Sequence, residues 1–166
     1  MLPEEVAKLI GKAGETVVME VEKGAIKRIA DAIGDSNPLY WDEEYARNSR
    51  CGGIIAPPGF TGWPAKWRWN LYLFYMPQYS DLYREWVDAM DKAGYTGRLD
   101  GGWEFDFFQL VRAGDTLACT PKITDIVERQ GKSGTLTLTT FEMTYINQNG
   151  DVVSKTRNNM IYRSRS

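Results

Sequence analysis

The N-terminal part of the chain carries its apolar residues at the spacing of helices. Between residues 26 and 33, four apolar side chains fall at positions i, i+3, i+4 and i+7, with charged side chains on the other face. This pattern predicts an amphipathic helix, and Gly34 is a typical residue to end it. Shorter helices are predicted after Pro3 and over residues 42–46, and a β-rich run at residues 16–21 predicts one early strand.

The last two-fifths of the chain alternates in the manner of β-strands. Aromatic residues alternate with acidic ones over residues 103–107, and long β-rich runs cover residues 116–127, 135–146 and 152–162. Glycine-containing turns separate these runs, and the Asn-Gly pair at residues 149–150 is a strong hairpin signal. The region therefore predicts four strands that follow one another as a meander.

Two further patterns complete the predicted fold. Residues 80–93 carry an apolar stripe at helical spacing, which predicts a second amphipathic helix ended by Gly94. In the run 135–146 the leucines and the aromatic residues occupy opposite phases, so a β-bulge is predicted near residues 139–140. Together these elements predict an α+β chain in which one antiparallel sheet of about five strands wraps around a central helix.

Length and composition are those of one compact domain. The 166 residues suffice for a single core, and a net charge of -2 gives no electrostatic argument for a nucleic acid or an anionic membrane as partner. The N-terminus has neither the basic nor the apolar region of a signal peptide, and the apolar stretches are too short to span a membrane. Cys51 and Cys119 are far apart in the sequence. Two such cysteines in a chain with an adequate core are typical of reduced thiols in a cytosolic protein. The sequence thus predicts a soluble cytoplasmic domain.

The chain contains no histidine. This excludes the commonest general base, the commonest metal ligand and any Ser–His or Cys–His nucleophile. Asp115, Asp125 and Glu142 are too widely spread for a divalent-cation site, so no metal is expected. Chemistry in this chain must rely on carboxylates, tyrosine, lysine, backbone dipoles or the side chains of another subunit.

The densest group of polar residues is Gly-Asp-Ser-Asn-Pro-Leu-Tyr-Trp-Asp at residues 34–42. Such residues are ordinary in turns, so the segment can be interpreted simply as a helix end, an Asx-Pro turn and a new helix start. Extended to residues 33–46, it also resembles the hydratase signature of the MaoC-like, hotdog-fold (R)-specific enoyl-thioester hydratases and 3-hydroxyacyl dehydratases. Residues 53–58, 101–105 and 111–117 are similar to further segments of that family.

The resemblance covers most of the chain and implies one hotdog domain over residues 1–166, with Asn70 to Tyr95 as an inserted helical segment. In catalytic members of the family an aspartate, and a histidine five residues later, hold the water that adds to the double bond of an enoyl thioester. Asp35 occupies the aspartate position, whereas Tyr40 occupies the histidine position. A tyrosine with a pKa of about 10 is a poor base at neutral pH.

Three functions are compatible with this replacement. The favoured one is a non-catalytic subunit of a hydratase, beside a second hotdog chain that carries the Asp/His dyad, in a heterodimer or heterotetramer joined through sheet edges. Alternatively, Asp35 and Tyr40 act together in a modified, self-sufficient hydratase, or the chain is a non-enzymatic domain that binds acyl thioesters. In each case the ligand is a thioester of CoA or of an acyl carrier, and no other cofactor is expected.

The expected substrate-binding residues fall in two places, the signature turn and the Pro-Pro-Gly-Phe segment at residues 57–60. N–H groups at a helix start can polarise a carbonyl, although a proline-rich helix start needs no such role. The aromatic and basic run at residues 63–69 can stack on nucleic-acid bases, but in an acidic chain core packing or acyl-pocket lining is favoured. The candidates for substrate binding are Asn37, Pro58, Gly59, Phe60 and Trp63.

Overall fold

The computed structural model describes residues 2–62, 80–131 and 134–164. The helices are α1 (Glu4–Ala7), α2 (Lys23–Ala32), α3 (Pro38–Trp41), α4 (Glu43–Asn48), the 3₁₀ turn η1 (Phe60–Gly62) and α6 (Ser80–Lys92). The strands are β1 (Val17–Glu20), β2 (Tyr95–Phe107), β3 (Thr116–Gly131), β4 (Gly134–Ile146) and β5 (Val152–Ser164).

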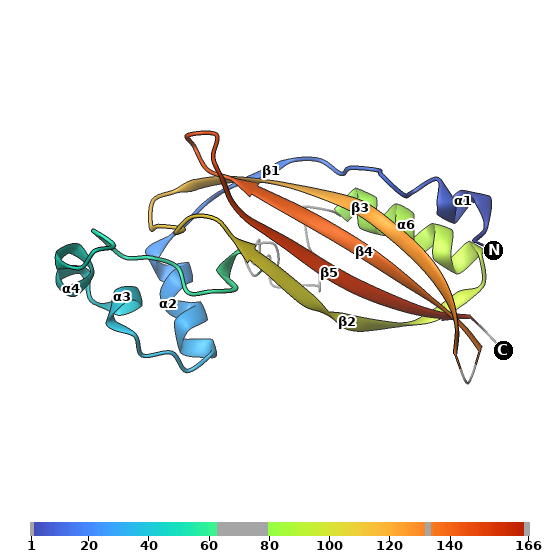
Figure 1. The fold of residues 1–166 in the computed structure, drawn as a ribbon, viewed down its shortest axis with the longest axis horizontal. Helices are drawn as coiled ribbons and strands as arrows, with labels where there is room; N and C mark the ends of the chain where they lie inside the picture. The colour runs from blue at the N-terminus through green and yellow to red at the C-terminus, as the bar shows by residue number, and fades with distance from the viewer. Residues whose placement is uncertain (1, 63–79, 132–133, 165–166) are drawn as a thin grey trace.

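The five strands form one antiparallel sheet in the order β1-β3-β4-β5-β2. Strands β3, β4 and β5 follow one another as a meander, while β1 and β2 pair at the two edges. Figure 1 shows α6 against one face of this long, curled sheet, and α2, α3 and α4 beyond one of its ends. The predicted α+β architecture with a single antiparallel sheet is therefore confirmed.

The face of the sheet that packs against α6 forms the core of the domain. The indole of Trp86, on α6, is completely buried and meets two sheet residues edge-on. Its ring centroid lies 5.1 Å from that of Phe141 on β4 and 4.9 Å from that of Tyr162 on β5. Edge-to-face contacts at these distances are favourable beyond the area they bury. We call this the inner face.

The bulge predicted near residues 139–140 of β4 lies on the facing strand, opposite Thr140 and Phe141. Strand β4 alternates without interruption, and the inner face continues through two buried threonines, Thr137 and Thr139. The irregularity lies on the neighbouring strand β3, between Ile123 and Asp125. The phase of β4 was misjudged because threonine was taken as a polar, outward-facing residue. Thr139 instead lies in the core, where its hydroxyl accepts a hydrogen bond from the Trp86 indole N–H at 2.9 Å.

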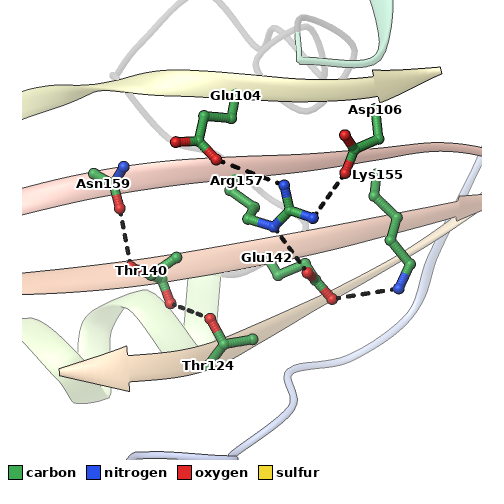
Figure 2. Close-up of polar contacts among 8 residues, drawn as sticks. All are labelled: Glu104, Asp106, Thr124, Thr140, Glu142, Lys155, Arg157 and Asn159. Atoms are coloured by element: carbon green, nitrogen blue, oxygen red, sulfur yellow. Dashed lines mark hydrogen bonds and ion pairs between the residues drawn. The ribbon is translucent and has the colours of Figure 1, made fainter.

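The opposite, outer face carries a network of charged side chains, which Figure 2 shows. Arg157 on β5 contacts three carboxylates on its two neighbouring strands: Asp106 at 2.7 Å, Glu104 at 3.6 Å and Glu142 at 3.3 Å. Hydrogen bonding to Asp106 raises the pKa of Arg157 above its ordinary value. The Lys155 ammonium lies 3.7 Å from Glu142 and adds a second positive charge. One arginine thus connects β2, β5 and β4 across a solvent-facing surface.

The predicted inserted segment, Asn70 to Tyr95, lies partly outside the described residues. Its described part consists of α6, which Gly94 ends with a positive φ of 81°, and Tyr95, the first residue of β2. Whether this segment is an insertion stays a prediction. None of the helices within residues 2–62, 80–131 and 134–164 is long and apolar enough to cross a membrane.

The two inner-face threonines of β4 provide a matched test of this core. Thr139→Val removes the acceptor of the Trp86 N–H and leaves that donor buried and unpaired, so we expect a loss of about 1–3 kcal/mol in the free energy of unfolding. The hydroxyl of Thr137 is buried without a hydrogen-bond partner among the described residues, so Thr137→Val should be neutral or stabilising. Urea denaturation of both variants checks the difference, and equal losses would contradict it.

Candidate functional site

The signature segment folds as two consecutive Asx turns after α2. Gly34 takes a positive φ of 69°, and the Asp35 N–H donates back to the carbonyl of Ala30 at 2.8 Å. The Asp35 carboxylate accepts a hydrogen bond from the N–H of Asn37 at 3.0 Å, and the Asn37 side chain accepts one from the N–H of Leu39 at 3.1 Å. Both polar residues of the signature therefore also shape the turn, as the structural interpretation of the sequence expected.

Tyr40, on α3, is buried, with 5% of its surface exposed, and lies near Asp35 and Cys51. Burial is the main cause that raises the pKa of Tyr40 above its ordinary value, and the charges of Asp35 and Cys51 raise it further. At neutral pH the phenol therefore keeps its proton and can donate a hydrogen bond. A neutral phenol with a raised pKa is a poor base toward water, so Tyr40 does not take over the role of a histidine base.

Asp35 also borders an open hollow of about 340 Å³. The indole N–H of Trp41 donates to the backbone carbonyl of Asp35 at 2.9 Å and holds the aromatic ring beside the turn. The hollow is lined by Ala30, Asp31, Gly34, Asp35, Ser36 and Trp41.

Pro58, Gly59 and Phe60 form a second group on a separate segment. Gly59 has a positive φ of 85°, and Phe60 is buried and begins the short 3₁₀ turn η1. This segment is connected to the signature through Ile55, whose N–H donates to the carbonyl of Leu39 at 3.3 Å. The structure thus brings Asp35, Asn37 and Tyr40 together in the Asx turns and the short helix α3 that follows, with the other candidates further along the chain. Trp63 lies outside the described residues.

Several buried polar residues near this second group were not predicted from the sequence. The hydroxyl of Thr61 lies 3.0 Å from that of Ser154 on β5 and ties η1 to the inner face. Thr156 and Asn158 follow Ser154 on the same face, and the Asn158 amide donates to the Asp100 carboxylate at 3.1 Å. A signal was present: along β5 small polar residues alternate with long charged ones, and the small ones turn inward.

The raised pKa of Tyr40 makes stability depend on alkaline pH. An unfolded tyrosine titrates near pH 10, whereas the folded value is higher, so the contribution of Tyr40 is complete below about pH 10 and is lost as the pH rises through the folded pKa. Tyr40→Phe cannot titrate, so its free energy of unfolding should fall less steeply above about pH 10. Urea denaturation at a series of pH values measures both slopes; parallel slopes above pH 10 would refute the assignment.

Comparison with known proteins places this geometry in a family. A match to the family described as FAS1-like, dehydratase domain region covers residues 8–156. A UPF0336 protein of Thermobifida fusca is 30% identical over 112 residues, which are 68% of this chain and 65% of that protein. A probable enoyl-CoA hydratase alpha subunit of Thermomonospora curvata is 27% identical over 136 residues, 80% of this chain and 41% of that protein. The match thus spans less than two-thirds of the length of either relative.

Among solved structures, one chain in the crystal structure of the ChsH1-ChsH2 complex from Mycobacterium tuberculosis has the same fold. The similarity has a TM-score of 0.80 at 21% identity and covers 98% of this chain and 91% of that one. The fold and the matched region agree with the resemblance carried by the turn at residues 33–46. The chain belongs to the FAS1-like dehydratase-region family and has the hotdog fold of the MaoC-like dehydratases.

Proposed function

We propose that this chain is the non-catalytic subunit of an enoyl-thioester hydratase, or 3-hydroxyacyl dehydratase, and works beside a second hotdog chain that carries the Asp/His dyad. The observation that carries the proposal is the state of Tyr40, which stands where catalytic members have histidine. Its side chain is buried and its pKa is raised by that burial, so the phenol stays neutral. The reaction class is that of the family. Because tyrosine replaces the histidine base in this chain, we infer that another subunit performs the chemical step.

Hydration of an enoyl thioester requires a base that accepts a proton from water, and the efficient base has a pKa near the working pH. The pKa of Tyr40 is raised by burial and so lies further from neutral pH than the pKa of an ordinary tyrosine. The Asp35 carboxylate is partly engaged, because it accepts the N–H of Asn37. We assign to this chain the shaping of the acyl pocket. Its ligand is a thioester of CoA or of an acyl carrier, and the proposed reaction needs no further cofactor. We place the protein in the cytoplasm.

The similar proteins support a subunit role. One relative is named a probable enoyl-CoA hydratase alpha subunit, and the structural neighbour comes from the crystal structure of a ChsH1-ChsH2 complex. Within the described residues, β2 pairs with β5 on one side only and leaves an edge thirteen residues long, whereas the opposite edge strand, β1, has four. Unpaired backbone groups along a long edge are a template for another strand.

Exposed apolar side chains lie at two places along this edge, near the start of β2 and at or just after its end. Leu99 is 63% exposed, Phe107 54%, Phe108 57% and Leu110 48%. Apolar groups next to unpaired backbone favour a protein partner, because its strand can satisfy the backbone while its side chains cover the apolar surface. We therefore place the partner hotdog chain on the β2 edge.

The first test is hydration of a short enoyl-CoA by the purified chain, alone and after co-expression with hotdog chains encoded next to it. We expect little activity alone and activity in the complex that co-purifies. In that complex, Asp35→Asn and Tyr40→Phe should change turnover by less than about tenfold, because loss of a working acid–base group costs ~10²–10⁴-fold.

Other results would assign a different function. Full turnover by the chain alone, lost in Asp35→Asn or Tyr40→Phe, would show a self-sufficient modified hydratase. Acyl-CoA binding without turnover, with or without a partner, would show a binding domain. The Tyr40→His variant of the chain alone is assayed in the same way. Activity gained by this variant would show that the remainder of a hydratase site is intact in this chain.

The second test concerns the edge. Leu99→Lys on β2 places a charge where the partner strand is expected and should weaken binding of the partner by about tenfold or more. Val18→Lys is the matched control, because Val18 is 62% exposed on the opposite edge strand β1. Co-purification and a titration of partner binding check both variants. Equal weakening by the two substitutions would contradict a site on β2.

A further inference from the structure

The segment that carries Asp35 and Tyr40 is joined by backbone hydrogen bonds to the turn before β3. We call residues 22–56 the helical lobe, which contains α2, α3 and α4 and lies beyond one end of the sheet (Figure 1). The turn at residues 111–116, just before and at the start of β3, meets the chain where it enters the lobe and where it leaves it. At the entrance, the Val21 N–H donates to the Asp115 carbonyl at 2.8 Å, and the Gly114 N–H donates to the Val21 carbonyl at 2.9 Å.

The exit from the lobe is held by the same turn. The Ala113 N–H donates to the carbonyl of Ile54 at 3.1 Å, and the Ala56 N–H donates to the carbonyl of Val111 at 2.8 Å. These four backbone hydrogen bonds fix the two ends of the lobe. Between these ends, a backbone hydrogen bond from Ile55 to Leu39 holds α3, and side chains add further contacts.

Arg112 is the side chain of this turn that reaches into the lobe. Its guanidinium donates a hydrogen bond to the backbone carbonyl of Cys51, 61 positions earlier in the chain. Cys51 follows α4, is buried, and lies close enough to Tyr40 to contribute to its raised pKa. The contact therefore ends on the segment that leads to Ile55, whose N–H donates to the carbonyl of Leu39, the neighbour of Tyr40.

Arg112 is itself linked, through Asp115, to the hairpin between β4 and β5. Its backbone N–H donates to the Asp115 carboxylate at 2.7 Å, and the other oxygen of that carboxylate accepts the Gln148 amide at 3.0 Å. The Gln148 carbonyl oxygen in turn accepts the N–H of Thr116 at 3.0 Å. Gln148 belongs to the hairpin between β4 and β5, so hydrogen bonds link that hairpin to the turn whose Arg112 side chain holds Cys51.

We propose that Arg112 is a positioning residue that holds the Cys51 segment, and with it Tyr40 and the signature turn, at a fixed place against the sheet. The geometric role stands on the contacts above, while its importance for hydration rests on the proposed function. The contact with the Cys51 carbonyl uses a single N–H donor of Arg112. Lysine also carries N–H donors and should replace arginine in part, whereas alanine has none and should not.

The thiol of Cys51 reports this role without a partner or substrate. Native protein is treated with a thiol reagent, and the modified cysteine is identified by mass spectrometry of peptides. Loss of one hydrogen bond should raise the fraction of locally open molecules about five- to tenfold, so Arg112→Ala should speed modification of Cys51 by that factor. Arg112→Lys should fall between Arg112→Ala and the native chain.

Two controls separate local from global effects. Arg50→Ala removes an exposed arginine next to Cys51 and should leave the rate unchanged. Cys119 lies fully buried on β3, where burial raises the pKa of its thiol to about 12, so it should stay unmodified while the sheet is folded. Equal Cys51 rates in Arg112→Ala and the native chain would overturn the proposal, as would joint exposure of both thiols.

Kinetics of the assembled complex then test the link to function. Arg112→Ala should raise KM more than it lowers kcat, because a displaced lobe weakens substrate binding while the dyad of the partner stays intact. If the native complex shows no hydration, the proposed function fails, and the thiol measurement still decides the role of Arg112. A loss confined to kcat with KM unchanged would refute the positioning role in the complex.

Discussion

Burial of the inner face of the sheet under Trp86 is the constraint on which the rest of the domain depends. A single antiparallel sheet has one face that must be shielded from water, and Trp86 is the largest fully buried side chain among the described residues. Removal of a tryptophan side chain from water contributes about 4–6 kcal/mol at the usual value per unit area. Its indole N–H must then find an acceptor, which is why a threonine, and not a larger apolar residue, stands at position 139.

The outer face follows from the same constraint. Once small polar and apolar side chains occupy the inner positions of β5, the alternate positions carry Lys155 and Arg157 toward solvent. Exposed ion pairs contribute little one at a time, but Arg157 contacts acids on both neighbouring strands and so favours a single register for β4, β5 and β2. The network thus opposes slippage of β2, which pairs on one side only within the described residues.

Much of the fold could be predicted from local pattern, and the failures have physical reasons. The helix ended by Gly34 and the meander were predicted because their signals lie within a few residues of one another. Strand β2 was predicted only over residues 103–107, although it begins at Tyr95, because its first eight residues contain three glycines. At Gly101 a Cβ would lie 2.9 Å from the carbonyl oxygen of Asn159, so close strand approach requires glycine there.

The candidate site divides in the same way. Asp35, Asn37 and Tyr40 could be found because they lie within six residues of one another, in a nine-residue stretch whose polar residues are visible in the sequence. Arg112 and Thr61 could not, because their partners, Cys51 and Ser154, are 61 and 93 positions away and only the folded sheet brings them together. Sequence spacing carries no signal for such contacts, and neither residue type is unusual at its place.

The edge strand β2 also bears on the choice between like and unlike partners. It carries three acidic residues, Asp100, Glu104 and Asp106, against one basic residue, Arg98. Pairing of two identical copies along this edge would set one acidic strand beside another, and like charges on adjacent strands oppose pairing. A strand of opposite charge meets no such repulsion. For the partner strand proposed on this edge, the charge pattern therefore favours an unlike chain over a second identical copy, and Asp100 contributes most to it because Arg157 already pairs with Glu104 and Asp106.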